Sequence, residues 1–240
     1  MSAILAEHND DRDGDAGVLL RLLEARHSCR GFRPEPLPRA TIEAMLEIAQ
    51  RSASWCNLQP WQVIVTEGEG TERLRRALYD HVTARMADGV AAVSDFPFPI
   101  YEGVYRERRR ATGSLLYEAT GVRRGDLAGA TRQSLENFRF FGAPHAVIIT
   151  TEDALGTYGA IDCGGYVATL LLAAQSLGVA SIAQASFASC SPFLRDYFGL
   201  PENRRVVCGL SIGIEDIEHP ANRFRTPRAS LAEAIDWAVD

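Results

Sequence analysis

The strongest constraint on the fold is an apolar, β-branched run that is followed by a long helix of small residues. The run from His145 to Thr151 has the composition of a buried strand. The segment from about Gly159 to Leu177 is rich in alanine, and Gly178 can end a helix there. Its Gly164-Gly165 pair would permit another helix to approach closely. The pair predicts a buried strand packed near a tightly packed helix.

Further helices and strands alternate on either side of this pair. Apolar residues at helical spacing predict helices, and short β-branched runs predict strands. The expected helices cover residues 18–25, 38–49, 71–87 and 191–199, and the expected strands cover residues 62–66, 179–183 and 206–214. The chain shows no internal repeat and no low-complexity linker. We therefore expect one α+β domain over residues 18–240.

One segment, 89–129, interrupts the alternation. It is rich in aromatic residues, proline and arginine, and includes Phe96-Pro97-Phe98-Pro99 and Arg106-Glu107-Arg108-Arg109-Arg110. We expect an excursion from the domain with its own short helices. A charge run of this kind is typical of a solvated helix face.

Composition excludes several classes of protein. The chain has 240 residues, of which 46% are hydrophobic, so it can bury a full core. A formal net charge of −6 argues against a nucleic-acid partner. The five cysteines are widely spaced without a Cys-x-x-Cys pair, and the histidines are isolated, so neither a disulfide framework nor a metal site is expected.

The N-terminal residues 1–17 are acidic and lack the basic start and apolar run of a secretory signal. They predict a disordered acidic tail on a cytoplasmic protein. No stretch approaches the ~20 apolar residues that a membrane helix requires, so no membrane association is expected.

Two polar clusters flank the expected helix at 38–49. The first, Arg26-His27-Ser28-Cys29-Arg30, offers two guanidiniums and a hydroxyl, which are the donors that a phosphate needs. The second, Ser54 to Trp61, offers amide side chains beside two indoles. Amides and indoles suit a flat heterocycle with a polar edge and stacking faces. Together the clusters indicate a phosphorylated, planar cofactor.

No motif for a catalytic nucleophile is present. The chain lacks a Gly-x-Ser-x-Gly elbow, a phosphate loop, a His-Glu-x-x-His pair and a Gly-x-Gly-x-x-Gly turn. If the protein is an enzyme, the chemistry belongs to a bound cofactor. No protein side chain is therefore assigned a catalytic role.

At this point the motifs, in their order and spacing, resemble those of a known family. Arg-His-Ser-x-Arg is followed by a helix and by Ser-x-x-Asn-x-Gln-Pro-Trp, and the similarity continues to the C-terminus through 139–144, 184–187 and 222–228. The chain resembles the nitroreductase superfamily of FMN-dependent oxidoreductases. This resemblance implies a central, mainly antiparallel sheet flanked by helices. It also implies an intertwined homodimer with the sites at the subunit interface.

The resemblance assigns one set of residues to the phosphate end of FMN. Arg26, Ser28 and Arg30 would hold the phosphate and the ribityl chain, and His27 would contribute at the flavin edge. Arg228 would close on the phosphate, with Arg225 as a weaker candidate.

A second set is assigned to the flavin ring. Ser54, Trp55 and Asn57 would reach the flavin from the partner subunit. Asn137 would face the pyrimidine edge, and the backbone of Ala185, Ser186 and Phe187 would lie near N5.

Two positions depart from the family pattern. Trp55 replaces a smaller residue, which could narrow the pocket or stack on a substrate. Phe140 stands where some relatives carry a lysine near the flavin carbonyl, so positive charge near the ring would come from the arginines.

The resemblance implies hydride transfer from NADPH or NADH through flavin N5 to a small aromatic acceptor, by a ping-pong mechanism. Nitroaromatic or quinone-like molecules are the expected acceptors. The excursion at 89–129, with Phe96, Phe98, Tyr101 and Tyr105, is the expected lid that selects among them. Its arginine run could alternatively attract the phosphates of the donor.

Other functions stay open at this stage. The same fold could serve another acceptor, as in an enone reductase or a dehalogenase, or the oxidation of a peptide or of the flavin itself. The chain could also be a non-catalytic flavin-binding protein or a nucleotide-binding regulator. The residues do not fix the physiological acceptor, the donor preference or the depth of nitro reduction.

Structural roles are the simpler alternatives for single residues. Arg26 and Arg30 could cap the carbonyl end of the first helix, and Asn57 could be a turn residue. Cys29 and Cys56 are each expected to be small buried thiols. Four further residues are expected to be structural, and these are Trp61, His81, His145 and His219.

Overall fold

The computed structural model describes residues 14–239 of the chain. Most of the expected acidic tail, residues 1–13, lies outside the described residues. The first helix, α2 (Asp15–Ala25), begins three residues before its expected start at 18. No helix in the described part of the chain is long and apolar enough to cross a membrane.

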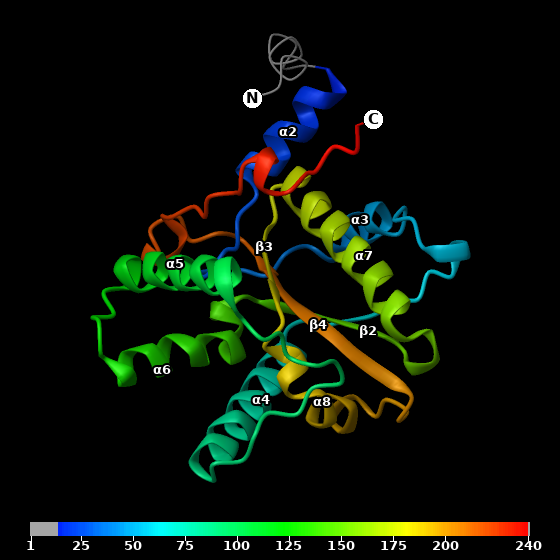
Figure 1. The fold of residues 1–240 in the computed structure, drawn as a ribbon. Helices are drawn as coiled ribbons and strands as arrows, with labels where there is room; N and C mark the ends of the chain where they lie inside the picture. Colours follow the sequence, from blue (N-terminus) through cyan, green and yellow to red (C-terminus); the bar gives the residue numbers. More distant parts are fainter. Residues whose placement is uncertain (1–13, 240) are drawn as a thin grey trace.

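Four strands form one sheet in the order β1-β2-β4-β3 (Figure 1). They are β1 (Gln62–Val65), β2 (His145–Glu152), β3 (Ala180–Gln184) and β4 (Arg204–Gly213). All three neighbouring pairs are antiparallel. The expected α+β fold with an antiparallel sheet is confirmed, and β3 stands at one edge of it.

Helices cover both faces of the sheet. On one face lie α3 (Arg39–Ala49) and α7 (Gly156–Ser176), and on the other lie α4 (Glu69–Ala87) and α8 (Ser191–Phe198). Two more helices, α5 (Gly103–Thr120) and α6 (Leu127–Leu135), lie outside these layers (Figure 1). Shorter 3₁₀ turns include η1 (Trp55–Asn57), η2 (Glu136–Gly142), η4 (Phe187–Ser189), η5 (Pro220–Asn222) and η6 (Leu231–Glu233). The expected boundaries of the main elements are correct to within a few residues.

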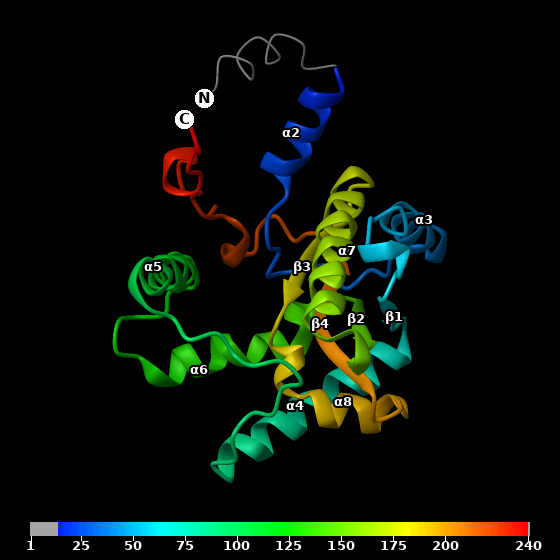
Figure 2. The ribbon, with the colours of Figure 1, turned by 45° about the vertical axis from the view of Figure 1, so that its right-hand side comes forward.

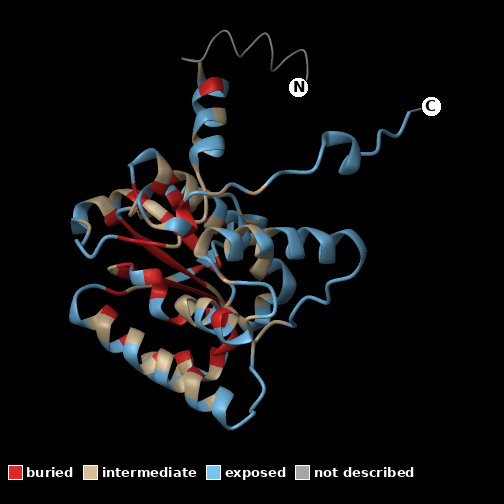
Figure 3. Cartoon of the chain, turned by 90° about the vertical axis from the view of Figure 1, so that its left-hand side faces the viewer, coloured by how far each residue is buried: buried red, intermediate tan, exposed pale blue. Residues whose placement is uncertain are grey.

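The central strand β2 is buried on both faces, which explains its continuous apolar sequence. Successive side chains of a strand point to opposite faces. Ala146 and Ile148 accordingly pack with α4 and α8, whereas Val147 and Ile149 pack with α3 and α7. Figure 3 shows this buried centre and the exposed helices around it. The fold is therefore three-layered, with the sheet in the middle.

A close contact fixes the turn that follows β3. A Cβ atom on Gly209 of β4 would lie 1.9 Å from the Phe187 ring, so only glycine admits this ring against the sheet. Phe187 is fully buried, and its backbone belongs to η4. The position of the Ala185–Phe187 turn is thereby set by core packing.

The excursion differs from expectation at both ends. The α6 helix continues to Leu135, beyond the expected limit at 129, and α5 has 18 residues. The start is tied to the core, because Val93 bridges to Cys190 and Asp95 bonds to Arg195 at 2.6 Å. The helices α5 and α6 themselves lie beside the free edge of β3 (Figures 1 and 2).

Candidate functional site

Two arginine-bearing segments that are far apart in the sequence line a cavity of about 630 Å³. One segment comprises the end of α2 and the residues after it, the other comes after η5, and Thr112 of α5 completes the lining. We call it the arginine pocket. Six residues that the sequence indicated line it, and these are Arg26, His27, Ser28, Arg30, Arg225 and Arg228. The residues predicted to surround the phosphate end of the cofactor thus lie around one cavity.

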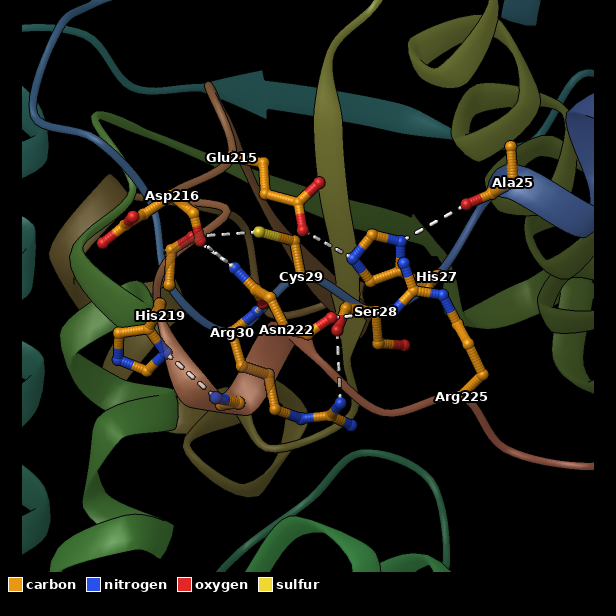
Figure 4. Close-up of polar contacts among 12 residues, drawn as sticks. Ala25, His27, Ser28, Cys29, Arg30, Glu215, Asp216, His219, Asn222 and Arg225 are labelled. Atoms are coloured by element: carbon orange, nitrogen blue, oxygen red, sulfur yellow. Dashed lines mark hydrogen bonds and ion pairs between the residues drawn. The ribbon is translucent and has the colours of Figure 1, made fainter. Parts of the chain in front are cut away.

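A buried side chain, Asn222, holds these two parts against each other (Figure 4). Its Oδ1 accepts a hydrogen bond from the Arg30 backbone N–H at 2.6 Å. Its Nδ2 donates to the carbonyl oxygens of Gly31 and Asp216, each at 2.9 Å. Because one amide satisfies three backbone groups, it fixes the path of the chain on both sides of the pocket.

Close packing beside this amide requires a glycine. A Cβ atom on Gly31 would lie 2.2 Å from the ring of His219. The Arg33 backbone N–H also donates to Ile214 O at 2.9 Å, which continues the contact between the two segments. Gly31 therefore permits the approach that places Arg225 and Arg228 opposite Arg26.

The four guanidiniums of the pocket lack acidic partners. Within the described residues, no carboxylate lies within 4.0 Å of any of them. Arg30 donates to Ser28 O at 3.2 Å and lies over the Phe224 ring. Arg225 and Arg228 donate to backbone oxygens of their own segment. A cluster of cations that bond only to neutral groups fits a phosphate.

The charges in this pocket disfavour one another. Burial and, next, the nearby Arg228 charge lower the pKa of Arg26. Burial also lowers the pKa of Arg30. Burial disfavours the charged form of both arginines, and repulsion from Arg228 adds to this effect at Arg26, so an anion in the pocket would favour the charged forms. Arg26 is the C-cap residue of α2, and its backbone N–H donates to Leu22 O at 3.0 Å. In the described part of the chain, neither the Arg26 nor the Arg30 guanidinium donates to a carbonyl of α2, so the capping role involves the Arg26 backbone and leaves both guanidiniums for a ligand.

The His27 ring lies between two acceptors. Its Nε2 is 2.9 Å from Glu215 Oε1, and its Nδ1 is 3.3 Å from Ala25 O. In Figure 4 the ring lies between Glu215 and Ala25, whereas the Arg30 side chain extends away from both of them. The imidazole is therefore held in place at the edge of the arginine pocket.

A second polar cluster lies at the other end of β3. Gln184 Nε2 donates to Asn137 O at 2.8 Å, and Ser186 Oγ donates to Asn137 Oδ1 at 3.4 Å. Ala185 is exposed beside them, whereas the Phe187 side chain is in the core. The structure therefore brings Asn137 together with the 185–187 turn, and for Phe187 only the backbone is available to a ligand.

The segment before β2 is held in an unusual conformation. Phe140 and Phe141 have φ angles of 59° and 52°, a region that bulky residues rarely adopt. Both rings are buried, and the centroids of the Phe140 and Phe187 rings are 5.2 Å apart. Core packing thus supports the strained backbone beside Asn137, and the Phe140 side chain faces the core rather than a ligand.

The free edge of β3 connects the two polar clusters. Cys29 N–H donates to Ser181 O at 3.1 Å, which sets the arginine segment at the start of this edge. Gln184 lies three residues further along the strand, or about 10 Å. An elongated ligand with an anionic end and a planar, polar-edged end fits this arrangement.

The third predicted group lies elsewhere. Ser54, Trp55 and Asn57 do not line the arginine pocket, and η1 lies on the side of α7 that faces away from α5 (Figure 1). The Trp55 ring is 53% exposed and contacts Tyr158, with 4.2 Å between ring centroids. Its backbone N–H donates to Asp162 Oδ2 at 3.1 Å. Within one chain, these residues cannot join the other two groups.

Among the residues expected to have structural roles, Cys29, Trp61 and His145 are buried as expected, and Cys56 is exposed. Cys29 is buried, and burial raises its pKa to about 12, so it stays a thiol. Cys56 is exposed, contrary to expectation, because η1 lies outside the core. Trp61 is in the core and stacks on Tyr166. His145 is buried and accepts a hydrogen bond from the Leu37 N–H at 3.0 Å.

Sequence reasoning missed the residues that assemble the site. Asn222 belongs to a quoted motif, yet its role depends on backbone groups far away in the sequence. Glu215 and Thr112 have no local signal at all, because tertiary packing alone brings Glu215 to His27 and Thr112 to the pocket. The one hint in the sequence is that an asparagine, Asn222, stands directly before the arginines of the 222–228 motif.

Comparison with known proteins agrees with this geometry. The model of the Nitroreductase family matches residues 23–214. The chain is 37% identical over 220 residues to nitroreductase NfnB of Mycolicibacterium smegmatis, covering 91% of this chain and 92% of that protein. It is 35% identical to the 4-nitrobenzoate reductase of a Nocardioides species, covering 91% of this chain and 89% of the relative.

A solved structure shows the same architecture. The FMN-dependent nitroreductase NfnB from Mycobacterium smegmatis, in complex with NADPH, superposes with a TM-score of 0.86 at 34% sequence identity. The match covers 93% of this chain and 99% of that one. Because the family model and the relatives both span most of its length, the chain belongs to the nitroreductase family.

Proposed function

We propose that the protein is an FMN-dependent oxidoreductase that uses NADPH or NADH to reduce nitroaromatic acceptors. The observation that carries the proposal is the arginine pocket, whose four guanidiniums have no carboxylate partner among the described residues. Relatives named as 4-nitrobenzoate reductases and a solved relative described as FMN-dependent support the choice of cofactor and acceptor.

The phosphate end of FMN is assigned to the arginine pocket. Arg26, Arg30 and Arg228 supply charge-assisted hydrogen bonds, and Arg225 is a weaker contributor. Ser28 adds a hydroxyl donor toward the ribityl chain. These groups are held before any ligand arrives, because Asn222 fixes the backbone on both sides.

The ring end is assigned to the cluster at the end of β3. The Asn137 side chain would bind the pyrimidine edge of the flavin ring, and the 185–187 backbone beside it would lie near N5. When bound, FMN supplies the hydride-transfer chemistry. The chain's own residues orient the ring, exclude water and provide positive charge through the arginines.

A second subunit is proposed to complete each site. In a homodimer, Ser54, Trp55 and Asn57 of one subunit would reach the flavin bound to the other. Support comes from the exposure of the Trp55 ring and from the exposed Tyr158 and Ile161 on α7 beside it. Exposed apolar side chains grouped on one face are typical of an interface.

The cytoplasmic location stays a prediction from the sequence.

The acceptor is proposed to enter beneath the 96–105 segment. Phe98, Tyr101 and Tyr105 are exposed on it, and the Arg109 guanidinium lies 4.9 Å from the Tyr101 ring centroid. Such a surface suits flat nitroaromatic or quinone-like molecules. Donor and acceptor would occupy the same space in turn, which gives ping-pong kinetics.

The first prediction concerns turnover. The purified protein saturated with FMN, in the absence of air, should lose its flavin absorbance on addition of NADPH and recover it on addition of 4-nitrobenzoate. Initial rates should give parallel double-reciprocal lines. Loss of absorbance without recovery would favour another acceptor or a non-catalytic flavin-binding protein. A protein that binds no FMN would contradict the proposal itself.

The second prediction concerns the phosphate assignment. Arg26→Ala and Arg228→Ala should each weaken FMN binding, because each removes a charge-assisted bond of about 1.5 to 3 kcal/mol. Fluorescence titration with FMN should show Kd increases of roughly 10- to 150-fold. The control is Arg223→Ala, since Arg223 is exposed, bonds to Glu218 and does not line the pocket. Equal FMN affinity in all three variants would remove the assignment.

The third prediction tests the shared site. One subunit carries Arg26→Ala and the other Asn57→Ala, each with a different affinity tag, so that mixed dimers can be isolated. If each site joins Arg26 of one subunit to Asn57 of the partner subunit, a mixed dimer regains one intact site. It should bind one FMN per dimer at a concentration where both parent variants stay largely empty. Mixed dimers no better than their parents would exclude the shared site.

A further inference from the structure

A second cavity, of about 350 Å³, lies between α4, α8 and the segment that follows α4. It shares no residue with the arginine pocket. The arginine pocket adjoins the start of β3, whereas α4 and α8 lie side by side beyond its end (Figures 1 and 2). Four residues of one α4 face contribute to the wall, and these are His81, Ala84, Arg85 and Asp88.

The cavity walls are largely apolar and aromatic. The His81 ring stacks on Phe193 with 4.5 Å between centroids and 23° between planes. Burial and the charge of Arg85 lower the pKa of His81, so this ring is uncharged in neutral solution. Val90 and Val93 also line the cavity, and these residues are 59% and 54% exposed. A lining that combines an aromatic pair with valines favours an apolar, planar occupant.

One cation faces this apolar space. Arg85 Nη1 donates to Ser189 O at 2.7 Å, and no carboxylate in the described part of the chain lies within 4.0 Å of it. Burial raises the pKa of the Cys190 thiol, which is therefore neutral. Asp88 is the one acidic residue of the lining, and it is exposed at the end of α4. The remaining donors of the guanidinium fork are available to an anion.

We propose that this cavity binds a small aromatic monocarboxylate, with its ring between the His81–Phe193 pair and the valines and its carboxylate on Arg85. The volume lies within the range of about 300 to 1,000 Å³ for small-molecule pockets, and apolar cavities of ~150 Å³ already hold a benzene ring. A lining with one guanidinium and one exposed carboxylate, Asp88, suits one negative charge better than a phosphate dianion.

Hydrogen bonds through η4 connect this cavity to the C-terminal end of β3. Arg85 holds the Ser189 carbonyl, and Ser189 Oγ donates to Ser186 O at 2.6 Å. A carboxylate that engages Arg85 therefore acts on the backbone that carries Ser186. The binding site itself uses none of the residues assigned to FMN, so it does not depend on the proposed function.

The probe is 4-fluorobenzoate, observed by ¹⁹F NMR during titration of the full chain saturated with FMN. Its neutral counterpart is 4-fluorobenzamide. Arg85→Gln removes the charge but keeps a donor, whereas Ala84→Phe keeps Arg85 and fills the cavity. Arg76→Gln is the matched control, because Arg76 is exposed on another part of α4 and does not line the cavity.

The wild-type protein and Arg76→Gln should bind the carboxylate saturably and about tenfold or more tightly than the amide. Arg85→Gln should bind both probes equally weakly, and Ala84→Phe should bind neither. If Arg85→Gln does not fold, Ala84→Phe decides. Saturable binding that is unchanged in Ala84→Phe would place the probe elsewhere, for example over the flavin, and would overturn the proposal. Absence of saturable binding to the wild-type protein would overturn it as well.

Discussion

A single buried amide joins the two parts of the chain that form the arginine pocket. Asn222 and Arg30 are 192 positions apart, yet the Asn222 side chain accepts from the Arg30 backbone and donates to two carbonyls. If the amide were lost, three buried or half-buried backbone groups would lack partners, which costs more than one ordinary hydrogen bond contributes. The positions of Arg26 and Arg228 follow from this contact, because both extend from the segments that it holds.

The apolar sheet and the charged pocket have opposite energetic roles. Alternate side chains of β2 bury apolar surface against two helical layers, and this burial stabilises the fold. The pocket instead gathers cations, and burial and, next, the nearby Arg228 charge lower the pKa of Arg26 there. A bound dianion would favour the charged forms, so FMN binding should also stabilise the fold. Added salt should weaken the binding, because it screens the same charges.

Local patterns were sufficient to predict the strands and the main helices, and they pointed to the arginines at 26 and 30 that line the pocket. The β2 run and the small-residue α7 helix have periodicity and composition that belong to one element each. Arg26 and Arg30 are close in sequence, so their grouping is local too. The pairing of Gly31 with His219 and the burial of Asp95 were not predictable, because each depends on residues that are distant in the chain. The role proposed for Asn57 involves a partner subunit, so neither one sequence nor one chain decides it.

The central claim is that the Asn222 amide assembles the phosphate site. The most direct test is the FMN affinity of Asn222→Ala beside that of Asn203→Ala, an exposed asparagine that bonds to Glu152. Circular dichroism should first confirm that both variants are folded at the temperature of the titration. We expect Asn222→Ala to bind FMN about tenfold or more weakly, and Asn203→Ala to bind it as the wild-type protein does. Wild-type FMN affinity in folded Asn222→Ala would contradict the account.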